Sequence, residues 1–328
     1  MSSATVSRVL NFDATLSVTP ETRQAVIETA EALNYATPRN RNRALAQGVG
    51  KIALAHFLRP EQELTDPYYV ALRLGVESRC QALKIETVKV YHADDLPGPA
   101  LLKGAAGVIA VGQHDAREIA WMRQHSRNLV FADFCPESDD LDSVQNDLAL
   151  AMRKLLDALE ALGYRRIAFA GWVEGGTGEP FAEARCRTYL AWTQARGLDG
   201  AASCLTDRNT EESGYRLARR MLEDAQRPDA LVTASDNMAV GAYRAVHELG
   251  LKIPDDIAVA SFNDISVAKF LNPPLSTVRL PAEEIGETAV ELLLERIGGR
   301  TLGKRITLAS QLMWRGSTRK PPPAKSGR

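Results

Sequence analysis

Long apolar runs are missing from this sequence, and cysteines are few. No stretch approaches the roughly 18 uninterrupted apolar residues of a membrane-spanning helix, and residues 1–30 contain no apolar core of signal-peptide length. The four cysteines lie far apart and form no Cys-x-x-Cys pair, which favours reduced thiols over a disulfide framework. These absences lead us to expect a cytoplasmic protein.

Motifs for catalysis, metal binding and nucleotide binding are also missing. The five histidines stand singly, without the ligand spacing of a metal site, and no G-x-S-x-G motif is present. The glycines at 171–178 match neither G-x-G-x-x-G nor the phosphate-binding P-loop. Asp133, Asp236 and Asp264 could form a carboxylate pair, but helix caps or hydrogen-bonding ligands are the favoured roles. We therefore expect no enzyme, no cofactor and no metal.

Neither sign of charge dominates, because 40 basic residues face 41 acidic ones and the net charge is -1. Residues 1–51 carry +2 and residues 313–328 carry +5, which leaves -8 for the residues between them. Basic ends on an acidic body suggest a segment that contacts a polyanion, although basic tails also serve only as solubilising ends.

From residue 51 onward, short β-branched apolar runs alternate with longer amphipathic patterns. Strands are predicted at 51–58, 86–90, 107–111, 129–132, 166–170, 230–233 and 257–261, and helices at 69–83, 115–125, 147–162, 181–196, 211–224, 236–249 and 281–297. This alternation predicts an α/β chain with parallel sheets, whose ligands bind beyond the carboxyl ends of the strands. Periodicity leaves open whether the strands form one wide sheet or two smaller doubly wound halves. The loops at that edge are predicted at 65–69, 133–136, 172–180, 234–237 and 262–266.

Capping residues indicate the bounds of two helices. Asp147 is predicted to cap a helix that ends at Gly163, and Asp236 to cap a helix that ends at Gly250. Each pair places an acceptor side chain before the helical pattern and a glycine after it.

Residues 1–50 do not follow the alternation. A short helix is predicted at 4–10, and Thr19 with Pro20 marks the start of a second helix that runs to Leu33. The first helix presents hydroxyls, an amide and one guanidinium, which suit the phosphates and base edges of DNA. These side chains are Ser2, Ser3, Thr5, Ser7, Arg8 and Asn11. An ordinary polar helix start explains the same composition, so the residues alone leave both interpretations open.

The motif ATVSRVLN at 4–11, followed by VTPETRQAVIETAEALNY at 18–35, closely resembles the lactose-repressor and galactose-repressor (LacI/GalR) family of bacterial transcription regulators. The resemblance continues through DPYY (66–69), GYRRIAFAG (163–171), TASDNMAVGAYRAVHELGLKIPDDIAVASFND (233–264) and NPPLSTVRLP (272–281), and it covers residues 1–318. Within the family, the chain looks most similar to the evolved β-galactosidase repressor subgroup.

The resemblance implies two doubly wound parallel-sheet subdomains, like those of periplasmic sugar-binding proteins, behind an all-α helix-turn-helix domain. It places that domain at 1–38, a hinge at 39–50, an effector-binding and dimerisation domain at 51–318 and a disordered tail at 319–328. The N-subdomain would comprise 51–146 plus 280–309, and the C-subdomain 147–279 plus 310–318. The family has a first helix about fourteen residues before this start. We therefore expect a longer native protein, with a genuine truncation as the alternative.

Members of the family bind a pseudo-palindromic operator as homodimers, so the resemblance assigns DNA contacts to the first helix and the hinge. Arg8 would be the principal base reader, with Ser3 and Ala4 beside it. Phosphates would be faced by Ser2, Thr5, Ser7 and Asn11. Leu45 would enter the minor groove and kink the duplex.

The resemblance also implies a sugar effector bound between the subdomains. The expected effector-binding residues are aromatic walls and hydrogen-bonding groups, namely Tyr68, Tyr69, Asp133, Trp172, Arg185, Ser235, Asp236 and Asn263. Asn209 replaces an aromatic residue of several relatives, which weakens any choice of sugar. The expected function is a sugar-responsive transcriptional repressor, with a galactoside as one candidate effector and the sign of the response open. The alternative is a cytosolic sugar sensor that does not bind DNA because the first helix is absent.

Overall fold

The computed structural model describes residues 2–10, 13, 15–32, 46–91, 96–173, 183–200 and 203–319. The chain divides into two compact units. Unit 1 comprises Met1–Glu63, Ala71–Gln145 and Glu283–Ile306, and unit 2 comprises Leu64–Val70, Asn146–Ala282 and Thr307–Arg328. Each unit is therefore assembled from segments that lie far apart in the sequence.

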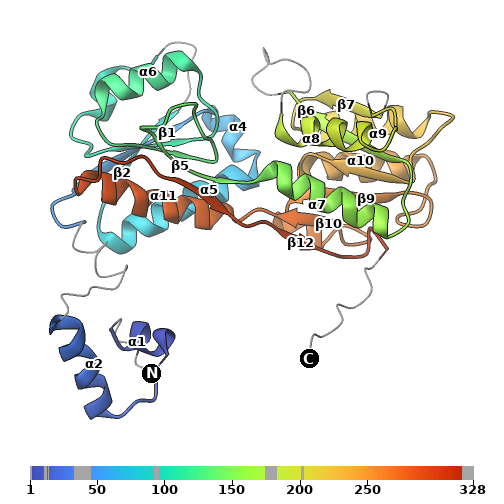
Figure 1. Ribbon diagram of the computed structural model, residues 1–328. Helices are drawn as coiled ribbons and strands as arrows, with labels where there is room; N and C mark the ends of the chain where they lie inside the picture. Colours follow the sequence, from blue (N-terminus) through green and yellow to red (C-terminus); the bar gives the residue numbers. More distant parts are fainter. Residues whose placement is uncertain are drawn as a thin grey trace. The chain divides into compact units, whose positions relative to one another are not determined.

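Among the described residues, two short helices precede the first sheet, α1 (Ser3–Leu10) and α2 (Pro20–Ala32) (Figure 1). The Ser2 hydroxyl accepts a hydrogen bond from the amide three residues later at 3.1 Å, and the Thr19 hydroxyl accepts the equivalent bond at 3.2 Å. A hydroxyl thus caps the start of each helix. The helices predicted at 4–10 and from Pro20 are confirmed.

Unit 1 is built on a six-stranded sheet. In spatial order, its strands are β11 (Arg305–Leu308), β5 (Asp142–Asn146), β4 (Leu129–Ala132), β3 (Val108–Val111), β1 (Lys51–His56) and β2 (Glu86–Tyr91). Every neighbouring pair from β5 to β2 is parallel. Besides α1 and α2, the described helical segments around this sheet are α4 (Pro60–Leu64), α5 (Pro67–Leu83), η1 (Pro99–Leu102), α6 (Ala116–His125) and α11 (Ala282–Ile297). Both β3 and β4 are buried along their whole length, as is typical of a parallel sheet with two covered faces.

Unit 2 contains a second six-stranded sheet. Its spatial order is β12 (Gln311–Met313), β10 (Ser276–Arg279), β9 (Ala258–Asn263), β8 (Ala230–Thr233), β6 (Ile167–Trp172) and β7 (Cys204–Asp207). Only β12 runs antiparallel to its neighbour in the pairs described. The helical segments are α7 (Leu148–Ala161), α8 (Ala184–Gln194), α9 (Glu211–Leu222), α10 (Asp236–Glu248) and η3 (Ser266–Lys269). Among the described residues, no helix is long and apolar enough to cross a membrane.

The two sheets answer the question that periodicity left open. The predicted α/β class is confirmed, and its strands form two doubly wound halves. Each strand and helix predicted from residue 51 onward is present. Five further strands were not predicted, and each of them has five residues or fewer: β5, β7, β10, β11 and β12.

Of the two predicted helix caps, one is confirmed and one is wrong by a single position. The Asp147 carboxylate accepts a hydrogen bond from the Leu150 amide at the start of α7, and Gly163 follows that helix with φ of 93°. For α10 the cap is Ser235, because the carboxylate of Asp236 is used in other hydrogen bonds within the unit. Gly250 ends this helix as predicted, with φ of 70°.

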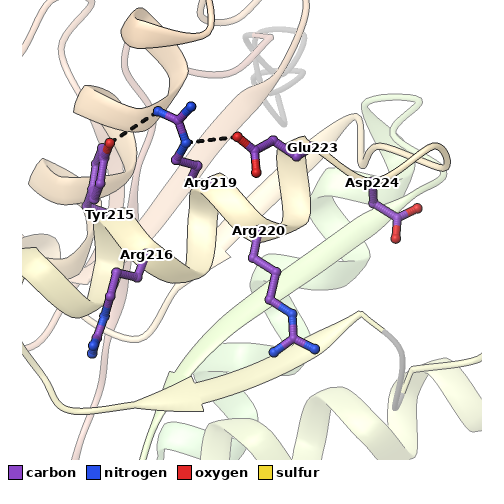
Figure 2. Close-up of a pocket in the computed structure, with 6 residues that line it drawn as sticks. All are labelled: Tyr215, Arg216, Arg219, Arg220, Glu223 and Asp224. Atoms are coloured by element: carbon purple, nitrogen blue, oxygen red, sulfur yellow. Dashed lines mark hydrogen bonds and ion pairs between the residues drawn. The ribbon is translucent and has the colours of Figure 1, made fainter.

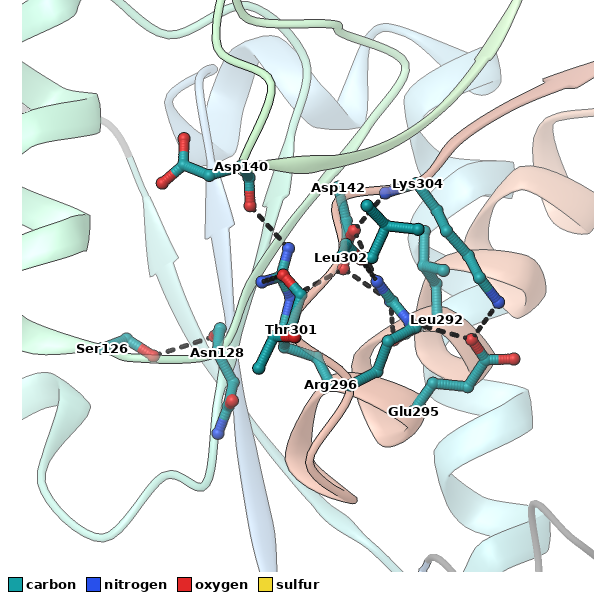
Figure 3. Close-up of polar contacts among 11 residues, drawn as sticks. Ser126, Asn128, Asp140, Asp142, Leu292, Glu295, Arg296, Thr301, Leu302 and Lys304 are labelled. Atoms are coloured by element: carbon teal, nitrogen blue, oxygen red, sulfur yellow. Dashed lines mark hydrogen bonds and ion pairs between the residues drawn. The ribbon is translucent and has the colours of Figure 1, made fainter.

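Strand β5 carries a fully buried carboxylate on Asp142, shown in Figure 3. Arg296 Nε and Arg300 Nη2 donate to its Oδ2 at 3.0 and 2.7 Å, and the Lys304 amide donates to its Oδ1 at 2.7 Å. Burial alone would raise the pKa of Asp142, but the hydrogen bonds from Arg300 and Arg296 hold it below its usual range. A polar strand therefore lies in the interior because α11 and the residues after it supply the opposite charge.

All four cysteines lie in the described part of the chain and are free thiols. The sulfur atoms of Cys186 and Cys204, both buried, are 3.0 Å apart. This contact joins α8 to the first residue of β7.

Candidate functional site

Polar side chains of unit 2 gather where its parallel strands end. Ser235 follows β8, Asn263 is the last residue of β9, and Trp172 is the last residue of β6. Doubly wound sheets bind ligands beyond these carboxyl ends. An effector site is therefore expected at this edge of unit 2.

The segment Leu64–Val70 is held against this edge of unit 2. Three asparagine side chains donate hydrogen bonds to it: Asn237 to the Thr65 carbonyl at 3.2 Å, Asn209 to Asp66 Oδ2 at 3.3 Å, and Asn146 to Tyr68 Oη at 3.2 Å. These bonds fix the start of α5, since the amide of Tyr68 also donates to Asp66 at 3.1 Å. The predicted residue Tyr68 is thereby positioned within unit 2.

The three predicted aromatic residues differ in exposure. Tyr68 is buried, and the ring of Tyr69 meets it edge-on with the ring centres 5.1 Å apart. Trp172 is partly exposed and lies opposite Asp207 in the sheet register. Tyr69 and Trp172 therefore leave aromatic surface that a ligand could contact.

Arg185 sits near the start of α8 with its guanidinium buried. Its Nε donates to Glu183 at 2.8 Å and its Nη1 to the Ala234 carbonyl at 2.5 Å, while the guanidinium lies 5.3 Å from the ring centre of Phe262. Glu183 also accepts the amides that begin α8, so one carboxylate caps the helix and orients the arginine. The Nη2 group donates no hydrogen bond to any described residue, which leaves one arm of the planar fork for a ligand.

Two members of this polar cluster were not predicted as effector-binding residues. Asn209 accepts a hydrogen bond from the Ser235 hydroxyl and donates one to Asp66, so it links the end of β8 to the segment before α5. Burial raises the pKa of Asp66, and its hydrogen bonds from the Tyr68 and Tyr69 amides act in the opposite direction. Asp66 falls in the loop predicted at 65–69 and begins the DPYY motif at 66–69, and these were the two signals for it.

Asp236 was predicted as an effector-binding residue, and its carboxylate is fully buried. One oxygen accepts from the Thr277 hydroxyl and the other from the Ile265 amide, both at 2.8 Å. Burial raises the pKa of Asp236 to about 7. These contacts connect α10 to the residues after β9 and to β10, so Asp236 holds the edge of unit 2 in shape.

Left-handed backbone marks two predicted positions. Asn263 has φ of 108° and Asp133 has φ of 63°, and such conformations in residues other than glycine concentrate at functional sites. The Asn263 side chain is partly exposed and makes no hydrogen bond to the described residues. Asp133 follows β4 in unit 1, at the carboxyl edge of that unit's own sheet.

The predicted base reader Arg8 lies on α1 with its side chain about half exposed, at 48%. Its Nε donates to Asp13 at 2.7 Å and its Nη2 to the Thr15 hydroxyl at 3.0 Å. Hydrogen bonds from Thr15 and then from Arg8 lower the pKa of Asp13 to about 2. The loop after α1 therefore holds the guanidinium in one orientation.

The other predicted DNA contacts are only partly described. Ser2 contacts the Thr5 hydroxyl at 2.8 Å, and Ala4 and Ser7 are exposed. Predictions for Asn11, for Leu45 and for the side chain of Ser3 fall outside the described residues, as does most of the predicted loop at 172–180.

A shallow pocket lies elsewhere, on the surface of α9 (Figure 2). Its lining is Tyr215, Arg216, Arg219, Arg220, Glu223 and Asp224. Arg219 Nε donates to Glu223 at 2.8 Å and its Nη1 donates to the Tyr215 hydroxyl at 3.2 Å, so the Arg219 guanidinium has partners within the pocket. It includes none of the predicted site residues. In the described ranges, no group of histidine, cysteine, aspartate and glutamate side chains could hold a metal ion.

Comparison with known proteins gives consistent matches over the whole chain. The periplasmic binding protein-like domain family matches residues 156–318, which agrees with the predicted fold. The HTH-type transcriptional regulator GalR of Lacticaseibacillus casei is 36% identical over 97% of this chain and 96% of its own length. The lactose operon repressor of Rhizobium radiobacter is 57% identical over 110 residues, which are 34% of this chain and 97% of that protein.

A solved structure, that of the transcriptional regulator CelR with cellobiose, resembles the fold with a TM-score of 0.70. It is 26% identical and covers 96% of this chain and 95% of that one. The matches thus extend from the first helices to the end of the second sheet. The chain belongs to the LacI/GalR family of transcriptional regulators, and not to a family of enzymes.

Proposed function

We propose that this regulator is a repressor whose effector is a galactoside, bound at the carboxyl edge of unit 2. The observation that carries the proposal is the cluster of Arg185, Ser235 and Asn263 with partly exposed aromatic surface beside it. Planar donors suit adjacent sugar hydroxyls, and an aromatic face suits the apolar side of a sugar ring. The similarity to a lactose operon repressor supports a galactoside. Within the family, we keep the evolved β-galactosidase repressor subgroup as the proposed place of this chain.

In this proposal Arg185 Nη2, the Ser235 hydroxyl and the Asn263 amide bind sugar hydroxyls. Tyr69 and Trp172 contact the ring, while Tyr68 and Asp236 position their neighbours. Asp133, which follows β4, is retained as a predicted effector-binding residue.

The DNA-binding proposal concerns residues 1–50. A homodimer would present two copies of α1 to a pseudo-palindromic operator, with Arg8 reading a base and Ser3 and Ala4 beside it. Phosphates would be bound by Ser2, Thr5, Ser7 and Asn11, and the minor groove by Leu45. Such a protein acts in the cytoplasm at the nucleoid. We retain 1–38, 39–50, 51–318 and 319–328 as the proposed DNA-binding domain, hinge, effector domain and tail.

Replacement of Arg185 by lysine tests the sugar site. Lysine can keep the ion pair with Glu183 but lacks the planar fork, so galactoside affinity measured by calorimetry should fall by about tenfold or more. Arg123→Lys is the matched control, because Arg123 forms an exposed ion pair with Asp140 in unit 1. Equal galactoside affinity in wild type and Arg185→Lys would remove Arg185 from the proposed site.

A further inference from the structure

We propose that Asp13 and Thr15 are positioning residues, which hold the Arg8 guanidinium in the orientation in which it reads guanine. The inference rests on the proposed function, in which Arg8 reads a base, and it adds two residues that the family resemblance did not assign. Both residues lie between α1 and α2 and contact one edge of the guanidinium.

The guanidinium of Arg8 has two edges that can each make a pair of parallel hydrogen bonds. Along the side edge, Nε donates to Asp13 Oδ2 at 2.7 Å and Nη2 donates to the Thr15 hydroxyl at 3.0 Å. Nη1 donates to no described residue, and Nη2 carries a second hydrogen. The end edge, formed by Nη1 and Nη2, is therefore the one left for DNA.

Asp13 also fixes the direction of the Thr15 hydroxyl. Thr15 donates to Asp13 Oδ1 at 2.7 Å through its hydroxyl and at 2.8 Å through its amide. Because the single hydroxyl hydrogen is used in this way, the oxygen presents its lone pairs to Arg8. The pKa of Asp13, lowered to about 2, keeps the carboxylate ionised at neutral pH. Its two oxygens thus act on one guanidinium, directly and through Thr15.

The backbone that carries these side chains is tied to both helices. The Asp13 amide donates to the Arg8 carbonyl at 3.0 Å, near the end of α1. Arg23 of α2 donates through Nη2 to the carbonyls of Asp13 and Leu16, at 3.5 and 3.4 Å. The Asp13 side chain is 29% exposed, against 48% for Arg8. Because its backbone is held, this carboxylate can keep the arginine in one orientation.

The free end edge matches guanine. Guanine presents two acceptors, O6 and N7, to the major groove, and an arginine donates to both at once through two N–H groups. A phosphate carries a negative charge, so its attraction to Arg8 falls more than that of guanine when Asp13 compensates the positive charge. Asp13 therefore favours a base contact of Arg8 over a phosphate contact, and it raises the preference for one base pair.

The test measures how strongly the full chain, purified from its host, prefers one base over another. A library of DNA duplexes, randomised over about 20 base pairs, is sequenced after binding, and the selected site is made as a single duplex. Kd values are measured for this duplex and for its single-base substitutions. The Arg8→Ala variant then identifies the base pair, expected to be G·C in each half-site, at which the preference comes from Arg8.

Asp13→Asn should reduce the preference at this base pair by about fivefold or more. Asparagine has one acceptor oxygen in place of two and carries no charge, so it cannot hold Arg8 and Thr15 together. Duplexes with another base at this position should bind as tightly as they bind to wild type, or more tightly, because one anion is removed. Glu28→Gln is the matched control, since it removes an exposed acid of α2 that contacts Gln24, and it should leave the preference unchanged.

A purely structural role of Asp13 predicts a different result, because damage to α1 weakens binding to every duplex by the same factor. Equal weakening of all duplexes, or an unchanged preference, overturns the inference and leaves Arg8 as the base reader. A wild type that binds all duplexes alike, or an Arg8→Ala variant that keeps every preference, contradicts the proposed function and the inference with it.

Two further variants test how Asp13 acts. Thr15→Val removes the hydroxyl that accepts from Nη2 and keeps the shape of the side chain, so the preference should fall by about two- to tenfold. In the Arg8→Ala background, Asp13→Asn should leave the remaining preferences unchanged, because the group that it positions is absent. A loss of preference in that background would show that Asp13 acts through another group, and would overturn the inference.

Discussion

Asp236 links the stability of unit 2 to pH. Its pKa rises from 3.8 to about 7 because the carboxyl is buried, so the folded state binds the proton more tightly than the unfolded state. Stability therefore falls as the pH rises from about 4 towards 7, because the folded protein must then bury a charge.

Asp236→Asn should remove this pH dependence. The asparagine oxygen can accept from the Ile265 amide, and its amide can donate to the Thr277 hydroxyl, so both contacts survive. The free energies of unfolding of the variant and of wild type are measured in urea at several pH values. The variant minus wild-type difference should increase with pH, by up to about 1 kcal/mol per pH unit between about pH 4 and 7. A difference that stays constant with pH would contradict this account of Asp236.

A site residue can be predicted from the sequence when its contacts lie close to it in the chain, and not when its partners are far away in the chain. The rule for strand ends predicted the loops at 234–237 and 262–266, and the family resemblance named Ser235 and Asn263 within them. Asn209 was noted only as the replacement for an aromatic residue. Its hydrogen bond to Asp66, 143 positions away, follows from no local pattern. The wrong cap has a similar origin, because Asp236 forms its bonds with residues 29 and 41 positions later.

Helices α9 and α10 pack closely because glycines lie at their contact. A Cβ atom on Gly214 would collide with the Met238 backbone, and one on Gly241 would lie 2.6 Å from the Tyr215 amide nitrogen. Backbone atoms cannot give way as a flexible side chain can. The pairing of these two helices therefore requires glycine on both sides.

Gly241→Ala should lower the free energy of unfolding by about 1 to 3 kcal/mol, measured by urea denaturation. Gly98→Ala is the matched control, since Gly98 has φ of -62° and open space around it. The control should change stability by less than about 1 kcal/mol. If the two variants had equal stability, the close approach of α9 and α10 would not limit the residue at 241.

Elements that carry their own signal could be predicted, and those that depend on distant partners could not. The four residues Ala230–Thr233 are all buried, and the apolar run gave β8 its correct bounds. Strand β5 was missed because its polar sequence becomes buried only through Arg296 and Arg300, more than 150 positions later. The three residues of β12 are too few to form a pattern.

At the scale of the whole molecule, a sugar-responsive regulator requires that two binding equilibria are linked. Family membership establishes a transcriptional regulator, and the polar side chains around Arg185 support sugar binding in unit 2. If sugar changes the affinity for operator DNA, then operator DNA must change the affinity for sugar by the same factor. The sequence does not tell whether sugar weakens or strengthens operator binding, because the same residues at the two sites are compatible with either effect.

The most direct test measures the Kd for operator DNA, with and without saturating galactoside, on the protein purified from its host. We expect the sugar to change this Kd by a factor of roughly 5 to 150. Arg185→Lys should bind the operator as wild type does and lose the response at the same sugar concentration. An operator Kd that stays the same when the sugar site is full would contradict the central claim.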